Sequence, residues 1–225
     1  MSVICILTEI RLRIKHFIYK GRLLMYKKQM LMQKIVCMMT LIASALVFVS
    51  SLGLSTDLYD ALSKTILYPD YDLEYTSVTG SRVYYDMFGF NSAFTVVGIV
   101  LILVNVLLFL TNTHSRRKYY IGNYIATGLS VAAAIGVSAW CIPQIADYKS
   151  QFQNNVDFEQ LKAFSKDWGT LYIGPEDTFW FDICFVVFGI LLLCAALLVL
   201  NCIFKVKVMK AEQRAIGSGK EVQNG

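Results

Sequence analysis

The sequence predicts an all-α membrane protein, a bundle of four transmembrane helices with two long extracytoplasmic loops. Three observations predict this fold class. Of the 225 residues, 56% are hydrophobic and only 16% are charged, against about 25% charged residues in soluble domains. Four long stretches contain no Asp, Glu, Lys or Arg, and the segments between them alternate between basic and acidic. This composition excludes a disordered chain, a collagen-like chain and an ordinary soluble enzyme.

The four uncharged stretches are each long enough to cross a bilayer. A hydrocarbon core of about 30 Å needs about 20 apolar residues in a helix, and a backbone in lipid must satisfy its own hydrogen bonds. We therefore expect helical spans at about 35–56, 91–113, 119–145 and 182–204. Together they would form one membrane domain over 35–204, between a basic N-terminal segment, 1–34, and a basic flexible tail, 205–225.

The positions of the charges predict the orientation of the bundle. Sixteen of the 21 Lys and Arg residues lie in the N-terminal segment, in the short loop around Arg116, and in the C-terminal tail. Thirteen of the 16 Asp and Glu residues lie in the other two loops, about 57–86 and 147–182. The positive-inside rule then places both termini in the cytoplasm of a multi-pass protein of the cell (inner or plasma) membrane. The partners expected for the basic ends are anionic inner-leaflet lipids and not nucleic acid.

The beginning of the first span allows a second interpretation. Met25 and Met30 could each start a shorter chain, in which Lys27, Lys28 and the following apolar run would resemble a signal peptide. Small residues near Ser50 would permit cleavage. Uncleaved, the same segment would be a signal-anchor and the first helix of the bundle.

The chemistry that most membrane enzymes and carriers need is missing from the sequence. Of the six cysteines none lies in the middle of an outer loop, and no C-x-x-C occurs, which excludes thioredoxin-like proteins and tetraspan families with disulfide-tied loops. A disulfide bond between Cys141 and Cys184 is an alternative that the sequence permits. The two histidines, His16 and His114, lie outside the spans, and no carboxylate lies within the four uncharged stretches. We therefore expect no catalytic residues, no metal and no cofactor.

Small residues recur in the third span at a spacing that permits close helix packing. Gly128, Ala132 and Gly136 form one row, and Ser130 begins a second. Small rows allow helix backbones to approach closely in lipid. The first row is a candidate helix-packing face inside the bundle or, alternatively, a face for self-association or a partner helix.

Two asparagines lie within apolar runs, Asn105 in the second span and Asn201 in the fourth. An asparagine in a membrane usually forms a hydrogen bond across a helix pair, worth about 1 kcal/mol. Both are therefore candidate packing residues. The alternative is that they line a polar pore or contact a substrate.

The first outer loop is rich in tyrosine. Residues 73–85 alternate Thr, Tyr and Val around Thr79 and Gly80, which predicts a small β-hairpin. A hairpin alone is marginally stable, so it would lean on the other loop, the bilayer or a partner. The candidate outer partner surface includes the tyrosines Tyr71, Tyr75, Tyr84 and Tyr85.

The second outer loop predicts a short amphipathic helix over residues 157–168. Phe158, Leu161, Phe164 and Trp168 recur at helical spacing. Their apolar face would lie on the bilayer or on the hairpin, and the charged face would point outward. Trp168 completes the candidate partner surface.

These features favour a non-catalytic accessory or interaction protein that presents its outer loops to a protein or envelope partner. A small oligomeric channel or transporter subunit is the alternative, and it requires the polar residues of the spans to converge on one interior. A membrane enzyme that uses loop carboxylates on a lipid or envelope substrate is a third, less favoured alternative.

Overall fold

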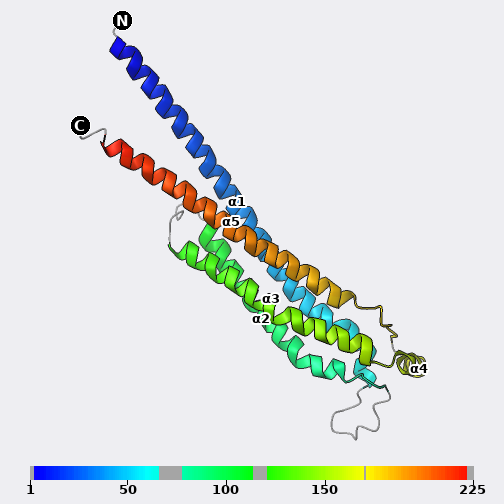
Figure 1. Cartoon of the computed structure of the whole chain (residues 1–225). Helices are drawn as coiled ribbons and strands as arrows, with labels where there is room; N and C mark the ends of the chain where they lie inside the picture. Colours follow the sequence, from blue (N-terminus) through cyan, green and yellow to red (C-terminus); the bar gives the residue numbers. More distant parts are fainter. Residues whose placement is uncertain (1–2, 66–77, 114–120, 170, 222–225) are drawn as a thin grey trace.

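All regular secondary structure in the computed structural model is helical over the residues that it describes, 3–65, 78–113, 121–169 and 171–221. The described residues form five α-helices and one 3-10 turn (Figure 1). They are α1 (Val3–Leu62), η1 (Ser63–Thr65), α2 (Val83–Thr113), α3 (Ile121–Asn155), α4 (Phe158–Trp168) and α5 (Phe179–Glu221).

Four of these helices are long and apolar enough to cross a membrane. The apolar segments are Lys27–Leu54, Val83–Thr113, Ile121–Asn155 and Phe179–Ala211. The chain is therefore a multi-pass membrane protein, as the uncharged stretches predict.

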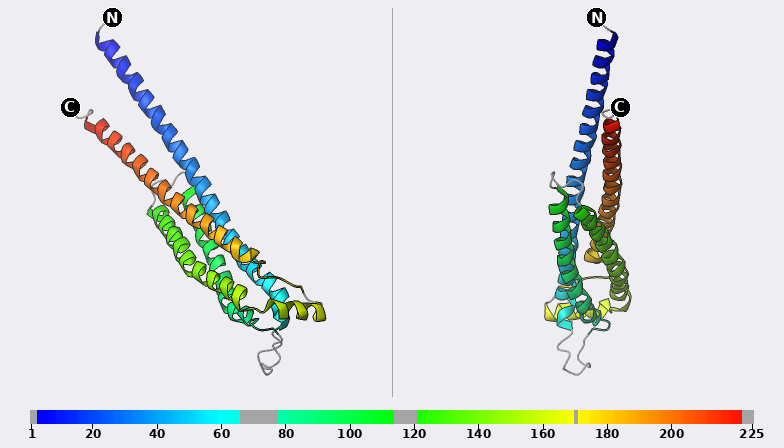
Figure 2. Two further views of the ribbon diagram at one scale, coloured as in Figure 1. Left: turned by 45° about the vertical axis from the view of Figure 1, so that its right-hand side comes forward. Right: turned by 90° about the vertical axis from the view of Figure 1, so that its left-hand side faces the viewer.

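The four long helices form a bundle in which each helix contacts two neighbours. α1 packs against α2 and α5, and α3 packs against the same two helices. Both chain termini extend from one end of the bundle, and α4 lies at the opposite end, across the direction of the long helices (Figure 2). We call the end that carries α4 the outer end and the other the termini end.

The outward faces of the long helices are apolar, as expected for contact with lipid. Leu103 and Leu110 of α2, Ile125 of α3 and Val186 of α5 are all exposed. The inward faces bury a core of aliphatic and aromatic side chains, including stacked Phe94 and Phe188. Because both faces are apolar, hydrophobicity alone does not distinguish the lipid side from the core side.

The long helices extend beyond the spans that the sequence predicts. α1 begins at Val3, and α5 continues through the predicted tail to Glu221. α2 begins at Val83 rather than near residue 91. α3 continues through Pro143 to Asn155. Polar and charged residues therefore occupy helical turns at both ends of the bundle.

The predicted β-hairpin is wrong. Residues 73–77 lie outside the described residues, but Val83, Tyr84 and Tyr85 form the first turn of α2. Gly80 does make a turn, with φ of 80°, but that turn leads into a helix: the amides of Val83 and Tyr84 donate to the carbonyls of Gly80 and Ser81. The β-propensity of Thr and Tyr is weak beside the packing of α2 in the bundle.

The amphipathic helix of the second loop is present as α4. Asp157 caps its start, accepting hydrogen bonds from the amides of Glu159 and Gln160 at 3.1 Å. Gly169 ends it in the left-handed conformation, and the Gly169 amide donates to the carbonyl of Ser165. These are the usual start and stop signals of a short helix.

Candidate functional site

The outer end carries a compact assembly, here called the outer cap, that consists of residues 78–82, α4 and residues 171–178. Its first junction joins the turn before α2 to the start of α4. The amide and hydroxyl of Thr79 both donate to Oε1 of Gln160, at 3.0 and 3.1 Å. The amide of Asp157 donates to the carbonyl of Thr79 at 3.0 Å. Gly80 lies so close to this junction that a Cβ atom would overlap the carbonyl of Asn155.

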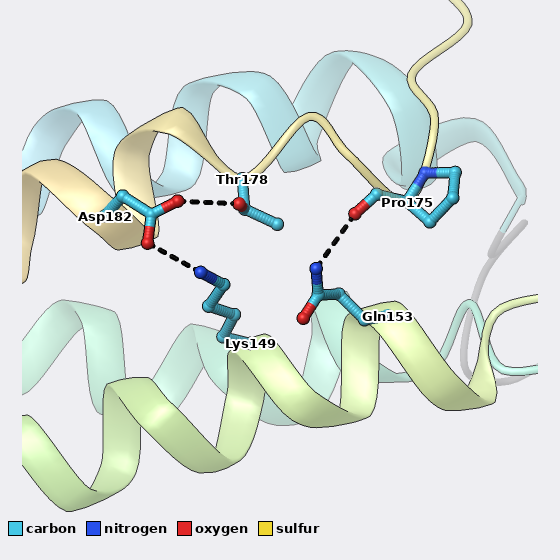
Figure 3. A network of polar contacts seen from close by, with 5 residues as sticks. All are labelled: Lys149, Gln153, Pro175, Thr178 and Asp182. Atoms are coloured by element: carbon cyan, nitrogen blue, oxygen red, sulfur yellow. Dashed lines mark hydrogen bonds and ion pairs between the residues drawn. The ribbon is translucent and has the colours of Figure 1, made fainter.

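A second junction joins the last turns of α3 to the start of α5 (Figure 3). Nζ of Lys149 lies 2.6 Å from Oδ1 of Asp182, and the hydroxyl of Thr178 donates to Oδ2 of the same carboxylate at 2.8 Å. One turn further along α3, Nε2 of Gln153 donates to the carbonyl of Pro175 at 3.1 Å. The segment that enters α5 is thus held at two points along α3.

α4 buries one face and exposes the other. Leu161 and Phe164 are buried, as is Phe152 at the end of α3, which packs edge-on against Phe158. The opposite face is charged and exposed, and it contains Glu159, Lys162, Lys166 and Asp167. The apolar face therefore lies on the bundle rather than being free to dip into lipid.

Two large apolar side chains remain exposed beside α4. Leu171 is 55% and Tyr172 is 41% exposed. The hydroxyl of Ser165 donates to the carbonyl of Leu171 at 3.5 Å, which places this segment alongside α4. Ile173, two residues after Leu171, is buried in the core and anchors the segment.

The structure describes only two of the four tyrosines predicted to form a partner surface, Tyr84 and Tyr85. Tyr71 and Tyr75 lie outside the described residues. Tyr84 is partly buried against the core, whereas Tyr85 is half exposed. Trp168 is the last residue of α4. Leu171 and Tyr172 are exposed cap residues that sequence reasoning missed, because they belong to no periodic pattern.

The bundle interior contains a middle polar layer around Asn105. Its Nδ2 donates to the hydroxyl of Ser44 on α1 at 2.7 Å, and its Oδ1 accepts from the hydroxyl of Ser130 on α3. All three residues are fully buried. Asn105 thus forms hydrogen bonds to two neighbouring helices, and this layer links three helices.

An inner polar layer lies nearer the termini end and involves all four long helices. Nε2 of Gln29 donates to Oδ1 of Asn201 at 3.3 Å and to Oε1 of Gln33 at 2.9 Å. Gln33 in turn donates to the carbonyl of Asn112, and Nδ2 of Asn112 donates to the carbonyl of Asn123 at 3.3 Å. Of the residues in this inner layer, sequence reasoning identified Asn201 alone. The i, i+4 spacing of Gln29 and Gln33 was the missed signal.

An apolar layer separates the two polar layers. It is a cluster of buried side chains from all four long helices: Val36, Cys37, Leu108, Ala126 and Leu198. Each of them is at most 5% exposed. Asn105 and Asn201 therefore belong to different layers and do not converge on one polar interior.

The two rows of small residues on α3 face in opposite directions. Ser130, Ala134 and Ser138 are buried against the bundle. Gly128 and Gly136 are exposed, and nothing lies within 4 Å of a Cβ atom built on either. Ala132 is exposed beside them. The predicted packing row thus lies on the outside of the bundle.

Two other glycines make the close helix contacts. A Cβ atom on Gly98 of α2 would lie 3.1 Å from Cα of Phe48 on α1. A Cβ atom on Gly53 of α1 would overlap the indole ring of Trp180 on α5. Neither glycine belongs to a row with four-residue spacing, so the sequence pattern gave no indication of either contact.

A shallow cleft opens between α1 and α2 toward the outer end. Its lining includes Thr56, Tyr84, Phe88, Ser92 and Val96. Asn91 and Thr95 complete it. The volume is about 500 Å³, and Oδ1 of Asn91 is buried without a hydrogen-bond partner.

Lys205 is a buried cation at the termini end. It is 5% exposed, and its Nζ has no hydrogen-bond partner. Nζ lies over the ring of Tyr124 on α3, 5.1 Å from the ring centroid. Such a contact is worth about 0.5–2 kcal/mol, whereas removing an ammonium from water costs several kcal/mol. The aromatic ring alone therefore does not offset the burial of this charge.

The described residues offer little for redox or metal chemistry. Cys141 and Cys184 are buried and free, so the possible bridge between them is not formed. Among the described residues no three His, Cys, Asp or Glu side chains lie close enough together to hold a metal ion. Of the outer carboxylates, Asp157 caps α4, Asp177 accepts from the amide of Gly174, and Asp182 binds Lys149.

No protein-family model, no curated protein and no solved structure matches the chain. Candidate functions therefore rest on the residues and contacts of this chain, above all on the outer cap, the two polar layers and Lys205.

Proposed function

We propose that this chain is a non-catalytic accessory protein of a membrane, which presents its outer cap to a protein partner. The observation that carries the proposal is the exposed pair Leu171 and Tyr172 beside the charged face of α4. Aromatic and apolar side chains bordered by charged ones are typical of protein contact surfaces.

The construction of the outer cap supports this proposal. Its segments are fixed to the bundle by the Thr79–Gln160 and Lys149–Asp182 junctions. A surface held in place loses little conformational freedom when a partner binds, and that favours affinity. The cap carboxylates Asp157 and Asp182 take part in capping and ion pairing, which disfavours an enzyme that would use them as acid or base.

The layered interior is the reason to rank a channel second. A water-filled path would have to pass through the layer of Val36, Cys37 and Leu108, which are buried apolar side chains. The middle and inner layers also use their polar groups in hydrogen bonds between helices. A path between several copies of the chain, along the exposed face of Gly128 and Gly136, is the form that the alternative would take.

Photo-crosslinking in cells of the native host tests the proposal. A photoreactive amino acid replaces Lys162 on the exposed face of α4, and in a matched control it replaces the lipid-facing Leu103 of α2. We expect one discrete adduct from the first position and none from the second.

A double variant connects the adduct to the exposed pair. Leu171→Ala with Tyr172→Ala should reduce its yield at least tenfold, because such contacts are each worth about 1 kcal/mol or more. The control Glu176→Ala, also exposed on the cap, should leave the yield unchanged. Adducts at Leu103 alone, or a pure homo-oligomer that conducts ions in bilayers, would favour the channel instead.

A further inference from the structure

We propose that Lys205 and Tyr124 form a binding site for a phosphate group at the termini end of the bundle. The site lies between α3 and α5 and is distinct from the outer cap. Nζ of Lys205 and the hydroxyl of Tyr124 are both buried, and neither has a hydrogen-bond partner. Two unsatisfied donors in one place are unusual, because buried polar groups are nearly always hydrogen-bonded.

Among the described residues, no carboxylate pairs with Lys205. α5 has no acidic residue between Asp182 and Glu212. Glu212 is seven residues beyond Lys205, or about 10 Å along the helix axis. α3 has none before Asp147, which lies toward the outer end, and between Glu9 and Asp57 α1 has none either. The one acidic residue of α2, Asp86, lies in its first turn at the outer end. We therefore expect the counter-anion of this ammonium to come from another molecule.

The depth of Lys205 in the membrane favours a lipid as the source of that anion. Residues 183–204 of α5 carry no charge, and in a helix they span about 33 Å. That length matches a hydrocarbon core of about 30 Å. Lys205 therefore lies where the core meets the headgroups, at the depth of the lipid phosphates.

The surroundings of Lys205 are positively charged. Lys207 and Lys210 follow it on α5, and Lys27, Lys28 and Lys34 lie on α1; all five are exposed. Such a field attracts anionic lipids and raises their local concentration. The long lysine stem is flexible, so the ammonium can turn from the Tyr124 ring toward a phosphate without a shift of the helices. The Tyr124 hydroxyl supplies a second donor.

Thermal unfolding of the full chain in a neutral detergent, after removal of native lipid, tests the site. The probes are phosphatidylglycerol, phosphatidylcholine and inorganic phosphate. We expect saturating phosphatidylglycerol to raise the Tm by about 5 °C or more. Phosphatidylcholine carries the same phosphate, but its own trimethylammonium group pairs with that charge, so this lipid should raise the Tm by less than about 1 °C.

Three variants assign the shift to the site. Lys205→Met should abolish it, Tyr124→Phe should reduce it, and Lys210→Met, which removes an exposed charge from the same helix, should retain it. Without lipid, Lys205→Met should unfold at the same temperature as the parent chain or higher, because an unpaired buried charge is replaced by an apolar side chain. If that variant does not fold, Lys205→Gln replaces it in the same comparison.

The outcomes distinguish the two possible sources of the phosphate. A shift that depends on Lys205 and occurs with phosphatidylglycerol alone supports a lipid site. The same dependence with inorganic phosphate supports a phosphate site that is filled from solution. Equal shifts in the parent chain and in Lys205→Met, or equal shifts with the two lipids, would overturn the proposal.

Discussion

The side chain of Asn105 on α2 is joined to that of Ser44 on α1, with Nδ2 of Asn105 2.7 Å from the serine hydroxyl. The same asparagine accepts from Ser130 on α3. One buried amide therefore sets the relative register of three helices in the middle of the bundle. In lipid such bonds contribute only modestly to stability, and their main effect is to fix the register of the helices.

Replacement of Asn105 by leucine should cost about 1–2 kcal/mol of unfolding free energy. The change keeps the side-chain volume roughly constant, but it leaves Ser130 without its acceptor and removes the link to Ser44. Unfolding in a mixed detergent titration measures the loss. Leu107→Ile is a control on the lipid-facing side of α2, where Leu107 is half exposed, and it should leave the stability unchanged. If Asn105→Leu is as stable as the parent chain, the middle layer does not hold the bundle together.

Asn105 and Asn201 could be picked out from the sequence because each interrupts an apolar run. Their partners could not. Ser44 has many possible neighbours, and Gln29 lies in a segment that looks like a basic flank rather than the start of a buried face. The pairing depends on how the helices rotate about their axes, and a sequence without a strong amphipathic pattern leaves that rotation undetermined.

The glycines of the spans also show that a sequence pattern does not determine which helices meet. The row of Gly128 and Gly136 has the spacing of a packing motif, yet it lies on the outside of the bundle. Gly98 has no such spacing, yet it lies against the backbone of Phe48. Spacing predicts that a face can pack closely, but it does not determine which neighbour that face meets.

Leucine at Gly98 should therefore be far more damaging than leucine at Gly136. At Gly98 the new side chain must push α1 and α2 apart, and overpacking of this kind costs about 1–3 kcal/mol. At Gly136 the side chain enters open space. We expect Gly98→Leu to lower the Tm and Gly136→Leu to leave it within about 1 °C when the protein is monomeric.

The oligomeric state of the same two variants adds a second measurement. If the exposed row is a self-association face, Gly136→Leu should change the mass of the detergent-solubilised assembly while monomer stability is unchanged. A fall in monomer stability for Gly136→Leu comparable to that for Gly98→Leu would contradict the placement of this row outside the bundle.

The outer loops were partly predictable. The second loop carries Asp157, four apolar positions at helical spacing and Gly169, and these local signals specify α4 almost completely. The first loop carries β-formers around Gly80, and that local preference is overruled by the packing of α2 in the bundle and by the contact of Thr79 with Asp157 across the outer cap. A contact between segments nearly 80 residues apart cannot be recognised from the local sequence.

Alanine at Gly80 should destabilise the outer cap more than alanine at Gly169. Both glycines have positive φ, 80° and 62°, so each change carries a backbone cost of about 1 kcal/mol. At Gly80 the methyl group would also overlap the carbonyl of Asn155, whereas at Gly169 it meets nothing within 4 Å.

Hydrogen exchange of the α4 amides measures the difference between the two variants. We expect Gly80→Ala to increase exchange across α4 and across the turn before α2. Gly169→Ala should affect only the last turn of α4. Equal exchange in the two variants would mean that the contact of Gly80 with Asn155 does not hold the cap.

The ion pair of Lys149 and Asp182 should stabilise the junction of α3 and α5 by about 0.3–1 kcal/mol. The distance of 2.6 Å is short, but the two side chains are 24% and 55% exposed, so water screens the attraction. A double-mutant cycle with Lys149→Met and Asp182→Asn isolates the coupling energy from other effects of each change.

The effect of salt tests whether the coupling between Lys149 and Asp182 is electrostatic. The coupling should fall in 1 M NaCl, where the Debye length is about 3 Å. The pair of Arg82 and Asp86 is the control, because its atoms are 3.5 Å apart and its side chains are 69% and 48% exposed. We expect a coupling near zero there at any salt concentration. A salt-independent coupling between Lys149 and Asp182 would instead indicate that the lysine stem holds the junction by packing against the start of α5.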